Sequence, residues 1–193
     1  MKNRCEWVSS DPLYIDYHDS EWGVPVYDDQ KLFEAVILDG FQAGLSWLTI
    51  LRKRENFRKA FDDFDATLIT NYDQKKINEL LNDAGIIRNK LKVRAAVTNA
   101  QAYLEIQKEF GSFEKYIWQF TDHKMKINHW QSLKEIPAKT AESDEMSKDM
   151  KKRGFKFVGS TICYAFMQAV GMVNDHTTDC FRYDEVIKLI KPG

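Results

Sequence analysis

Two cysteines and two histidines at opposite ends of the chain form a possible metal-binding set. Cys5 and His18 lie near the N-terminus, whereas His176 and Cys180 are separated by three residues near the C-terminus. A His-x3-Cys spacing brings two ligands to one side of a helical turn or compact loop. Together the four would make a closed tetrahedral Cys2His2 zinc set, which indicates a structural clasp because catalytic zinc keeps one position open. The wide spacing of Cys5 and His18 matches no zinc-finger pattern, so ordinary packing of the His-x3-Cys pair stays an alternative.

Aromatic side chains are dense toward the N-terminus, which suggests either a core or the walls of a binding pocket. Tyrosine and tryptophan pack well in cores, and they also stack on nucleic-acid bases. A carboxylate, Asp39, ends an apolar helical pattern, where a negative charge opposes the helix dipole. It could accept a hydrogen bond from an exocyclic amine, so a binding role competes with an exposed helix end. The aromatic residues are Trp7, Tyr14, Tyr17, Trp22 and, later, Trp47.

The formal net charge of −1 conceals three basic segments. Residues 52–59, 86–94 and 146–160 hold 14 of the 28 Lys and Arg residues but only 2 of the 29 Asp and Glu residues. If these segments shared one surface, they would form a track for DNA phosphates. Otherwise each is a solvated helix face. The near-zero net charge excludes only a uniformly basic DNA-binding protein.

A glycine-containing break separates two helical patterns in the middle of the chain. Gly85 follows Asp83 and precedes several cations, including Lys90. A tight helix–Gly–helix turn exposes backbone N–H groups that attract a phosphate, which is how helix-hairpin-helix modules bind a DNA backbone. A plain structural turn stays an alternative, because many helical hairpins contain glycine.

The elements that must position these residues are predicted to be helices. Apolar residues recur at helical spacing, no segment alternates with period two, and the chain has only 4 Pro and 9 Gly. The fold class is therefore all-α. Gly40 is expected to interrupt the first helix, and the second helix is expected to begin near Ser46. Ser112 and Ser143 are expected to cap later helices. The predicted helical segments are 28–38, 46–57, 73–82, 93–104, 112–120, 143–153 and 159–170.

Length and composition limit the protein class. A chain of 193 residues suits one domain with a sizeable core, so we expect a single unit over 1–193. No apolar run long enough to cross a membrane and no secretory signal are seen. Cys5, Cys163 and Cys180 are too few for a disulfide framework, so a cytoplasmic location is expected.

The ordered motifs resemble the bacterial 3-methyladenine DNA glycosylase I family. The matching runs are RCEWVSSDPLYIDYHDSEWGVP (4–25), KLFEAVILDGFQAGLSWLTILRKRENFRKAF (31–61), DAGIIRNKLK (83–92) and SKDMKKRGFKFVGSTICYAFMQAVGMVNDH (147–176). The resemblance implies a helix-hairpin-helix fold. It also implies a hydrolase that flips 3-methyladenine out of alkylated double-stranded DNA and cleaves its N-glycosidic bond. A monomer is expected.

The resemblance also assigns roles to residues. It implies that the helix-hairpin-helix spans about 73–100 with its glycine at Gly85, and that segments 1–25 and 155–185 form a zinc clasp. A loop at 42–45, including Gln42, Gly44 and Leu45, would fill the gap left by the flipped base. The zinc ligands would be Cys5, His18, His176 and Cys180, and the base pocket Tyr14, Tyr17 and Trp47 with Asp39 as its carboxylate.

One departure from the family concerns the carboxylate. The family has Glu where this chain has Asp39, and the missing methylene shortens its reach, so the alternatives are a tighter pocket, a bridging water or weaker base selection. Many helix-hairpin-helix glycosylases use an Asp downstream of the hairpin, whereas residues 88–104 contain no Asp or Glu, so we expect weak chemical activation and labile substrates. No lysine is placed as a nucleophile, which predicts a monofunctional enzyme that uses water. The alternative is a non-catalytic, zinc-stabilised DNA-binding or lesion-recognition module.

Overall fold

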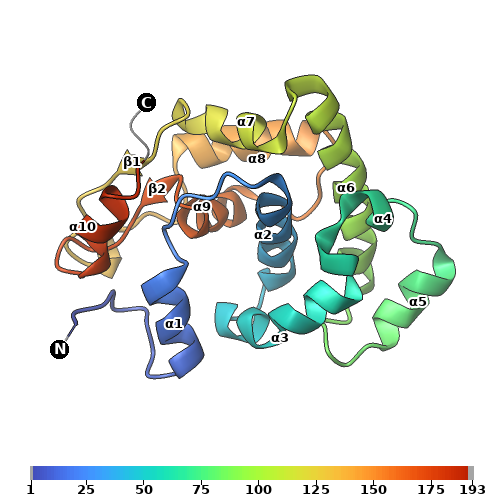
Figure 1. The fold of residues 1–193 in the computed structure, drawn as a ribbon, viewed down its shortest axis with the longest axis horizontal. Coiled ribbons are helices and arrows are strands. Elements are labelled where there is room, and N and C mark those ends of the chain that lie inside the picture. The colour runs from blue at the N-terminus through green and yellow to red at the C-terminus, as the bar shows by residue number, and fades with distance from the viewer. Residues whose placement is uncertain (1, 191–193) are drawn as a thin grey trace.

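The computed structural model describes residues 2–190 and is mostly helical, which confirms the predicted class (Figure 1). One small exception is a two-residue parallel pairing of β1 with β2, in which Lys126 lies opposite Val173. Strands this short carry no alternation that a sequence could show. The elements are α1 (Pro12–Ser20), α2 (Asp29–Gln42), α3 (Trp47–Ala60), η1 (Asp62–Phe64), α4 (Ala66–Ile69), α5 (Gln74–Asn82), α6 (Lys90–Phe110), α7 (Phe113–Trp118), η2 (Gln119–Thr121), β1 (Lys126–Ile127), η3 (Leu133–Glu135), α8 (Ala141–Lys152), α9 (Ser160–Ala169), β2 (Val173–Asn174) and α10 (Arg182–Ile187).

Helix α2 lies at the centre of the molecule, with α3, α6, α7 and α9 packed around it (Figure 1). Its N-cap is Asp28, and its apolar stripe includes the fully buried Leu32 and Phe33. The prediction that Gly40 interrupts this helix was wrong. A Cβ atom on Gly40 would lie 3.3 Å from Cβ of Phe157, so the glycine allows a close approach between helix and loop. The helix continues past Gly40 through Phe41, which is buried in the core, and ends at Gln42.

The structure confirms one of the two predicted caps and also the predicted helix start near Ser46. Ser46 caps α3 and Ser112 caps α7, each through a hydrogen bond to a backbone N–H. Ser143 is not the cap of α8. Thr140 begins that helix, and Ser143 is the third helical residue, whose hydroxyl accepts a bond from the Thr140 N–H in a capping box. After α8, Gly154 adopts a φ of +101°, which favours glycine.

The N-terminal segment lies beside the turn that precedes α10. The Asn3 side-chain amide donates to a carboxylate oxygen of Asp179 at 2.6 Å, and the Phe181 N–H donates to the Asn3 carbonyl at 3.0 Å. A second apolar cluster beside this junction is separate from the main core and contains Cys5, Tyr17, Trp22, Leu51 and Cys180. No helix among the described residues is long and apolar enough to cross a membrane.

Candidate functional site

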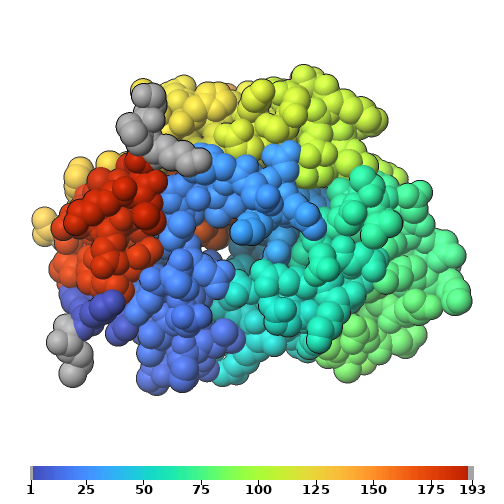
Figure 2. Space-filling view, in the orientation of Figure 1, coloured from blue at the N-terminus to red at the C-terminus, as the bar shows by residue number. Residues whose placement is uncertain are grey.

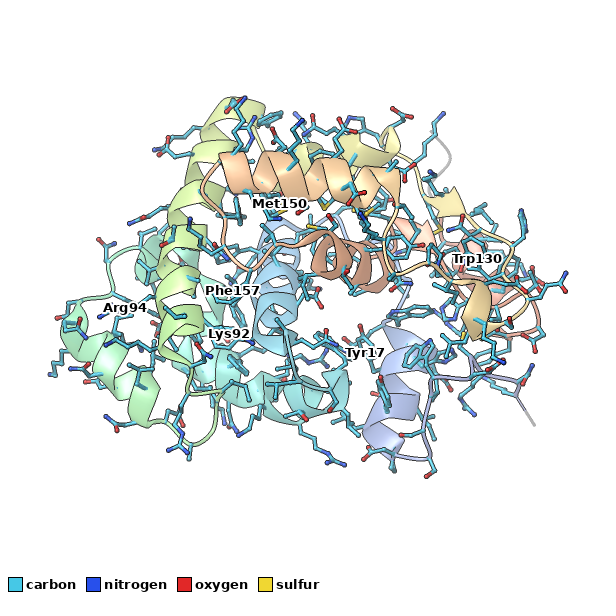
Figure 3. The ribbon with its side chains drawn as sticks, turned by 180° about the vertical axis from the view of Figure 1, so that it is seen from behind. Tyr17, Lys92, Arg94, Trp130, Met150 and Phe157 are labelled. Carbon is cyan, nitrogen blue, oxygen red and sulfur yellow. The ribbon has the colours of Figure 1, made fainter. Side chains whose placement is uncertain are left out.

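An aromatic cavity of about 250 Å³ lies between α1, α2, α3 and α9. Figure 3 shows Tyr17 directed toward the open centre of the molecule, where this cavity lies. The cavity brings together all four residues that the sequence suggested for a base pocket, from three separate elements. Its lining is Trp7, Tyr14, Tyr17, Trp22, Asp39, Gln42, Trp47, Leu133, Ile136, Ala165, Gln168 and Ala169, and we call it the aromatic cavity.

The aromatic cavity is lined by residues whose buried polar atoms lack partners. Four buried side-chain nitrogen or oxygen atoms among residues 2–190 have no hydrogen-bond partner, and three belong to this lining. They are the indole nitrogens of Trp7 and Trp47 and one oxygen of Asp39. A buried polar group without a partner costs roughly 1–3 kcal/mol, so native proteins keep few of them. Two donors and one acceptor therefore fit a ligand with polar edges.

The Asp39 carboxyl is in an apolar setting. It is only 2% exposed, and burial raises its pKa well above the ordinary aspartate value. Burial also raises the pKa of Tyr17, and the nearby Asp39 raises it further. Arg54 offsets part of the Tyr17 shift, whereas burial alone sets the Asp39 shift, so the protonated carboxyl is favoured at Asp39. A positively charged ligand would reverse this preference and favour the carboxylate. The sequence had suggested an exposed helix end as the alternative, and the burial of Asp39 excludes it.

The aromatic walls are held by ring-to-ring contacts. The ring centres of Tyr17 and Trp47 lie 5.5 Å apart and tilted by 50°. The ring centre of Trp7 lies 5.0 Å from the ring centres of both Tyr14 and Trp22. Such contacts add stabilisation beyond area burial. They keep the walls in place without filling the space between them.

A second cavity of about 310 Å³ meets the aromatic cavity at Tyr17, Asp39, Trp47 and Ala169. It opens where Figure 2 shows a hollow bordered by α1, the start of α2 and α3. Two arginine–glutamate pairs lie in its lining, and one of them, Arg54 with Glu21, has two hydrogen bonds of 2.6 and 2.8 Å. Asp39 thus lines both hollows, and the arginine–glutamate pairs lie only in the lining of the second.

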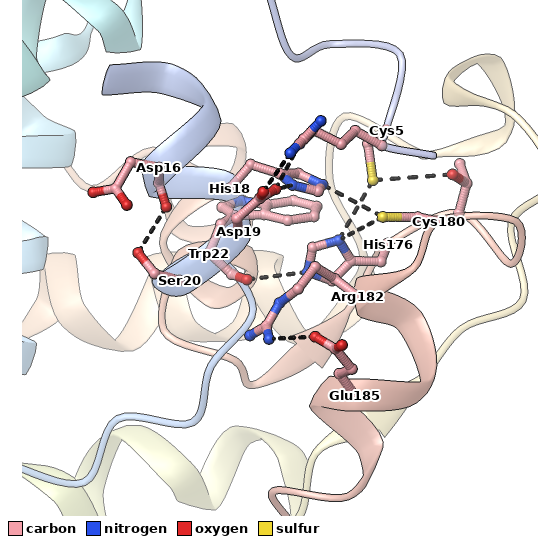
Figure 4. Close-up of polar contacts among 12 residues, drawn as sticks. Cys5, Asp16, His18, Asp19, Ser20, Trp22, His176, Cys180, Arg182 and Glu185 are labelled. Atoms are coloured by element: carbon pink, nitrogen blue, oxygen red, sulfur yellow. Dashed lines mark hydrogen bonds and ion pairs between the residues drawn. The ribbon is translucent and has the colours of Figure 1, made fainter. Parts of the chain in front are cut away.

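The four predicted metal ligands meet in one buried cluster, the Cys–His cluster (Figure 4). Their ligand atoms all lie within 4.8 Å of one another. Cys5 Sγ is 3.4 Å from Nδ1 of His176, and Cys180 Sγ is 3.6 Å from the same nitrogen and 3.5 Å from Nε2 of His18. In a tetrahedron with bonds of about 2.1–2.3 Å, neighbouring ligands lie roughly 3.4–3.8 Å apart. The four groups could therefore hold a metal ion with little movement.

The outer nitrogen of each histidine ring has its own partner (Figure 4). Nδ1 of His18 lies 2.8 Å from an oxygen of Asp19, which Arg4 holds through two further bonds. Nε2 of His176 lies 3.1 Å from the Trp22 carbonyl oxygen. These contacts orient both rings and leave the inner nitrogens toward the two sulfurs, as metal-binding histidines require.

The two thiols share one proton-binding environment. The pKa of Cys5 is raised, mainly by a hydrogen bond to Cys180 and secondly by burial. The pKa of Cys180 is lowered, mainly by that same hydrogen bond and also by hydrogen bonds with His176 and His18. A thiolate is thus favoured at Cys180, and thiolate is the form that binds metal. Cys163, in contrast, is buried in the main core and remote from this set.

The loop after α2 is fixed by a lysine that the sequence did not single out. The ammonium of Lys92 donates to the carbonyls of Phe41 at 2.8 Å and Ala43 at 2.6 Å. A cation there complements the carbonyl end of the helix. Gly44 then adopts a φ of +83°, and Leu45 follows with 41% of its surface exposed. Gln42 lines the aromatic cavity, so the loop predicted to face DNA begins at its edge.

The turn between α5 and α6 differs in detail from the expectation. The Gly85 N–H donates to Oδ1 of Asp83 at 2.7 Å, so this amide is not free for a phosphate. A Cβ at Gly85 would lie 2.9 Å from that oxygen, which explains the glycine. Lys90, the first residue of α6, is exposed. Two helices, α5 and α6, do flank this turn, but its glycine amide serves the turn itself.

The first basic segment is largely neutralised inside the protein. Arg52 pairs with Asp11, Arg54 with Glu21, and Arg58 with both Glu34 and Glu55. Lys53 donates to the carbonyls of Ala84 and Gly85 and so supports the turn. Three of the cations in 52–59 are thus paired with carboxylates, which favours the alternative of a solvated helix face for this segment.

Sequence reasoning missed the far wall of the aromatic cavity. Leu133, Ile136 and Gln168 line it, and Asp175 organises this side. Asp175 accepts four hydrogen bonds, from Asn128, Trp130, Tyr164 and Gln168, at 2.6–2.8 Å. The only signal in the sequence was the position of Asp175 next to His176, a predicted metal ligand.

Comparisons with known proteins agree over almost the whole chain. The sequence model of the methyladenine glycosylase family matches residues 7–183. DNA-3-methyladenine glycosylase 1 of Escherichia coli strain K12 is 51% identical over 180 residues, which cover 93% of this chain and 96% of that protein. A crystal structure of 3-methyladenine DNA glycosylase I is 52% identical, with a TM-score of 0.91 and coverage of 93% and 98%. The Staphylococcus aureus 3-methyladenine DNA glycosylase I, solved to describe 3-methyladenine recognition, is 36% identical, with a TM-score of 0.90 and coverage of 93% and 96%.

Proposed function

Because the chain belongs to the methyladenine glycosylase family, we propose that its aromatic cavity receives 3-methyladenine flipped out of alkylated duplex DNA. The protein is a DNA repair glycosylase that removes 3-methyladenine. Our proposal adds which residues recognise the base, how its charge is used, and which segments hold the DNA.

The observation that carries the proposal is the set of unpartnered polar atoms in an aromatic wall. Asp39 offers an acceptor to the exocyclic amine of the base, and Trp47 offers an N–H to a ring nitrogen. Tyr14, Tyr17 and Trp47 stack on the purine. A methylated, positively charged purine gains from ring faces through cation–π attraction. Each group thus obtains from the base what the empty cavity lacks.

The charge of the substrate explains a buried aspartate. Methylation at N3 gives the base a positive charge, which makes it a good leaving group before any catalysis. That charge lowers the pKa of Asp39 from its raised value in the empty cavity, so base and carboxylate form a buried ion pair. An unmethylated adenine brings no charge and leaves the carboxylate uncompensated. Selectivity therefore comes from electrostatics as much as from shape.

The chemistry that follows is hydrolysis at the sugar. The bond between C1′ of the deoxyribose and the purine nitrogen breaks, the electron pair leaves with the base, and water adds to C1′. The chain holds the base in place and excludes bulk water from it. Because residues 88–104 carry no carboxylate, we propose that activation of water is weak and that only labile bases are released. No strand cleavage follows.

The DNA itself is held outside the cavity. We assign a helix-hairpin-helix to about 73–100, with Gly85 shaping its turn and Lys90 facing a phosphate. Leu45, exposed on the Gly44 turn, fills the gap left by the base, and Gln42 lies between gap and cavity.

We further propose that the Cys–His cluster binds Zn²⁺. Two sulfur and two nitrogen donors at tetrahedral spacing match a structural zinc site, and all four are buried. A bound zinc supplies folding stability and no open position for a reactant. The residues themselves do the positioning: Trp22, whose carbonyl accepts from His176, also lines the aromatic cavity.

The test is release of free base from methylated duplex DNA, followed by chromatography. Wild type releases 3-methyladenine, whereas Asp39→Asn and Trp47→Ala release it much more slowly while still binding duplex DNA. If wild type binds DNA but releases no base, the chain is a non-catalytic recognition module instead. Rapid strand cleavage at the abasic product would contradict the monofunctional mechanism.

A further inference from the structure

Phe157 is an exposed aromatic residue in an unfavourable backbone conformation. It lies in the segment between α8 and α9, is 36% exposed, and has a φ of +58°. Left-handed backbone is uncommon for residues with a side chain and is an outlier for a bulky one. Such conformations persist only where the surrounding structure enforces them, and they cluster at functional sites.

The residues on both sides of Phe157 enforce this conformation. The side chain of Asn99 on α6 donates to the Lys156 carbonyl at 3.1 Å and accepts from the Lys156 N–H at 2.8 Å. Ser147 on α8 donates to the Val158 carbonyl at 2.6 Å. Both Asn99 and Ser147 are buried. Three side-chain bonds therefore fix the peptides around Phe157 while much of its ring stays in contact with solvent.

Phe157 also lies beside the loop that we assign to the DNA gap. Its ring centre is 5.9 Å from the Lys92 ammonium, which in turn holds the carbonyls of Phe41 and Ala43. Its Cβ lies against Gly40 of α2, one residue after Asp39. Figure 3 shows Phe157 and Lys92 between α2 and α6, with Arg94 farther out on α6.

The charges around this ring suit a polyanion. Lys156 next to it and Arg94 on α6 are exposed. Proteins that bind unstacked nucleotides combine cations with aromatic rings on which bases stack. Solvent exposure alone gives no compensation for the strained backbone, whereas contact with an unstacked base does.

We propose that Phe157 is a second DNA-contacting side chain, which stacks on a base or sugar beside the flipped nucleotide while Leu45 occupies the gap. The inference rests on the proposed function, because it needs duplex DNA bound across the α2–α6 surface. It assigns Phe157 to holding the distorted duplex and no role in recognising the methylated base.

The experiment measures the dissociation constant for a duplex with a tetrahydrofuran abasic analogue. Phe157→Ala weakens binding about 10-fold, within the range for loss of one base–aromatic stack, and Phe157→Tyr restores it. The slope of log Kd against log salt is unchanged, because no phosphate contact is lost. Ile127→Ala is the matched control, since Ile127 is 38% exposed in β1 and distant from α2, and it binds as wild type does.

A glycine variant separates a DNA contact from a purely structural role. Phe157→Gly removes the left-handed strain, so we expect its melting temperature to stay the same or rise while its DNA binding still falls. Binding of free 3-methyladenine is unchanged in both variants. Wild-type affinity for the abasic duplex in Phe157→Ala and Phe157→Gly would overturn the inference. If wild type itself released no 3-methyladenine, the proposed function would fail instead.

Discussion

The Cys–His cluster and the aromatic cavity share Trp22, yet they satisfy their polar atoms in opposite ways. In the cluster, the outer nitrogen of each histidine has a partner and the inner ones face sulfur. In the cavity, the Trp47 nitrogen and one Asp39 oxygen have none. The four ligand atoms of the cluster could all be satisfied by one metal ion. The cavity is left incomplete, and a ligand supplies the missing bonds.

The difference separates stability from function. Groups that are satisfied within the fold stabilise it, whereas buried unsatisfied groups destabilise it and favour ligand binding. The two regions should therefore respond in opposite directions to substitution. Loss of a cluster ligand costs stability first, and loss of a cavity group costs binding first.

The largest expected effect is on the stability of the cluster. His176→Ala removes one ligand and a bond to the Trp22 carbonyl, so the free energy of unfolding in urea should fall by about 4 kcal/mol or more. Elemental analysis should find one zinc per chain in wild type and none in the variant. The control is Cys163→Ala, a buried cysteine outside the cluster, which should retain its zinc. Unchanged stability together with no zinc in wild type would contradict the clasp.

A second prediction uses the raised pKa of Asp39. A carboxyl whose folded-state pKa is raised stabilises the fold below its unfolded pKa, near 4, and loses that contribution as pH rises through the folded value. Asp39→Asn removes this titration. The variant should thus gain stability over wild type as pH rises, while kcat/KM for base release falls about 100-fold. Urea unfolding from pH 4 to 9 checks the first part. Parallel curves for both proteins would show that the pKa is not raised.

The activity of wild type should rise with pH, whereas the contribution of Asp39 to the stability of the fold falls with pH. Because the carboxylate form binds the cationic base, kcat/KM should rise with pH through the raised pKa of Asp39 and then level off. In Asp39→Asn this rise should vanish. A rise of equal size in both proteins would assign it to another group.

The smallest effect is expected for one indole N–H. In the protein, the ring centres of Trp47 and Tyr17 lie 5.5 Å apart. Trp47→Phe keeps an aromatic ring at this position but removes the indole N–H, so affinity for free 3-methyladenine should fall about 2- to 10-fold. Stability should stay constant or rise slightly, since an unpartnered buried N–H is lost. A fluorescence titration with Trp7→Phe in parallel tells which of the two indoles faces the base. Wild-type affinity in Trp47→Phe would remove this nitrogen from recognition.

Local signals in the sequence predicted much of this arrangement. The cap at Ser112 and the helix start near Ser46 could be predicted because the capping rule needs only neighbouring residues. The Cys–His cluster and the aromatic residues were found because few other residue types do their chemistry. Gly40 and Ser143 were misjudged, since the packing of Phe157 and the competing cap Thr140 decide their roles.

Long-range contacts explain what sequence could not predict. The arginines of 52–59 pair with acids such as Asp11, 41 residues away, so a local charge count overstated the free positive surface. The hydrogen-bond partners of Lys92 lie at least 49 residues away in the sequence. Those of Asp175 lie up to 47 residues away. The strain at Phe157 exists only because α6 and α8 hold the segment between them. Such roles follow from the fold rather than from any motif.

The most direct test of the incomplete cavity is calorimetric titration of free 3-methyladenine into wild type and Asp39→Asn. Both titrations are made at the same pH, which lies above the raised pKa of Asp39. The account predicts that wild type binds the base at one site per chain and that the variant binds it at least 10-fold more weakly, with its melting temperature undiminished. Equal affinity in the two proteins would contradict the claim that the buried carboxyl of Asp39 recognises the methylated base.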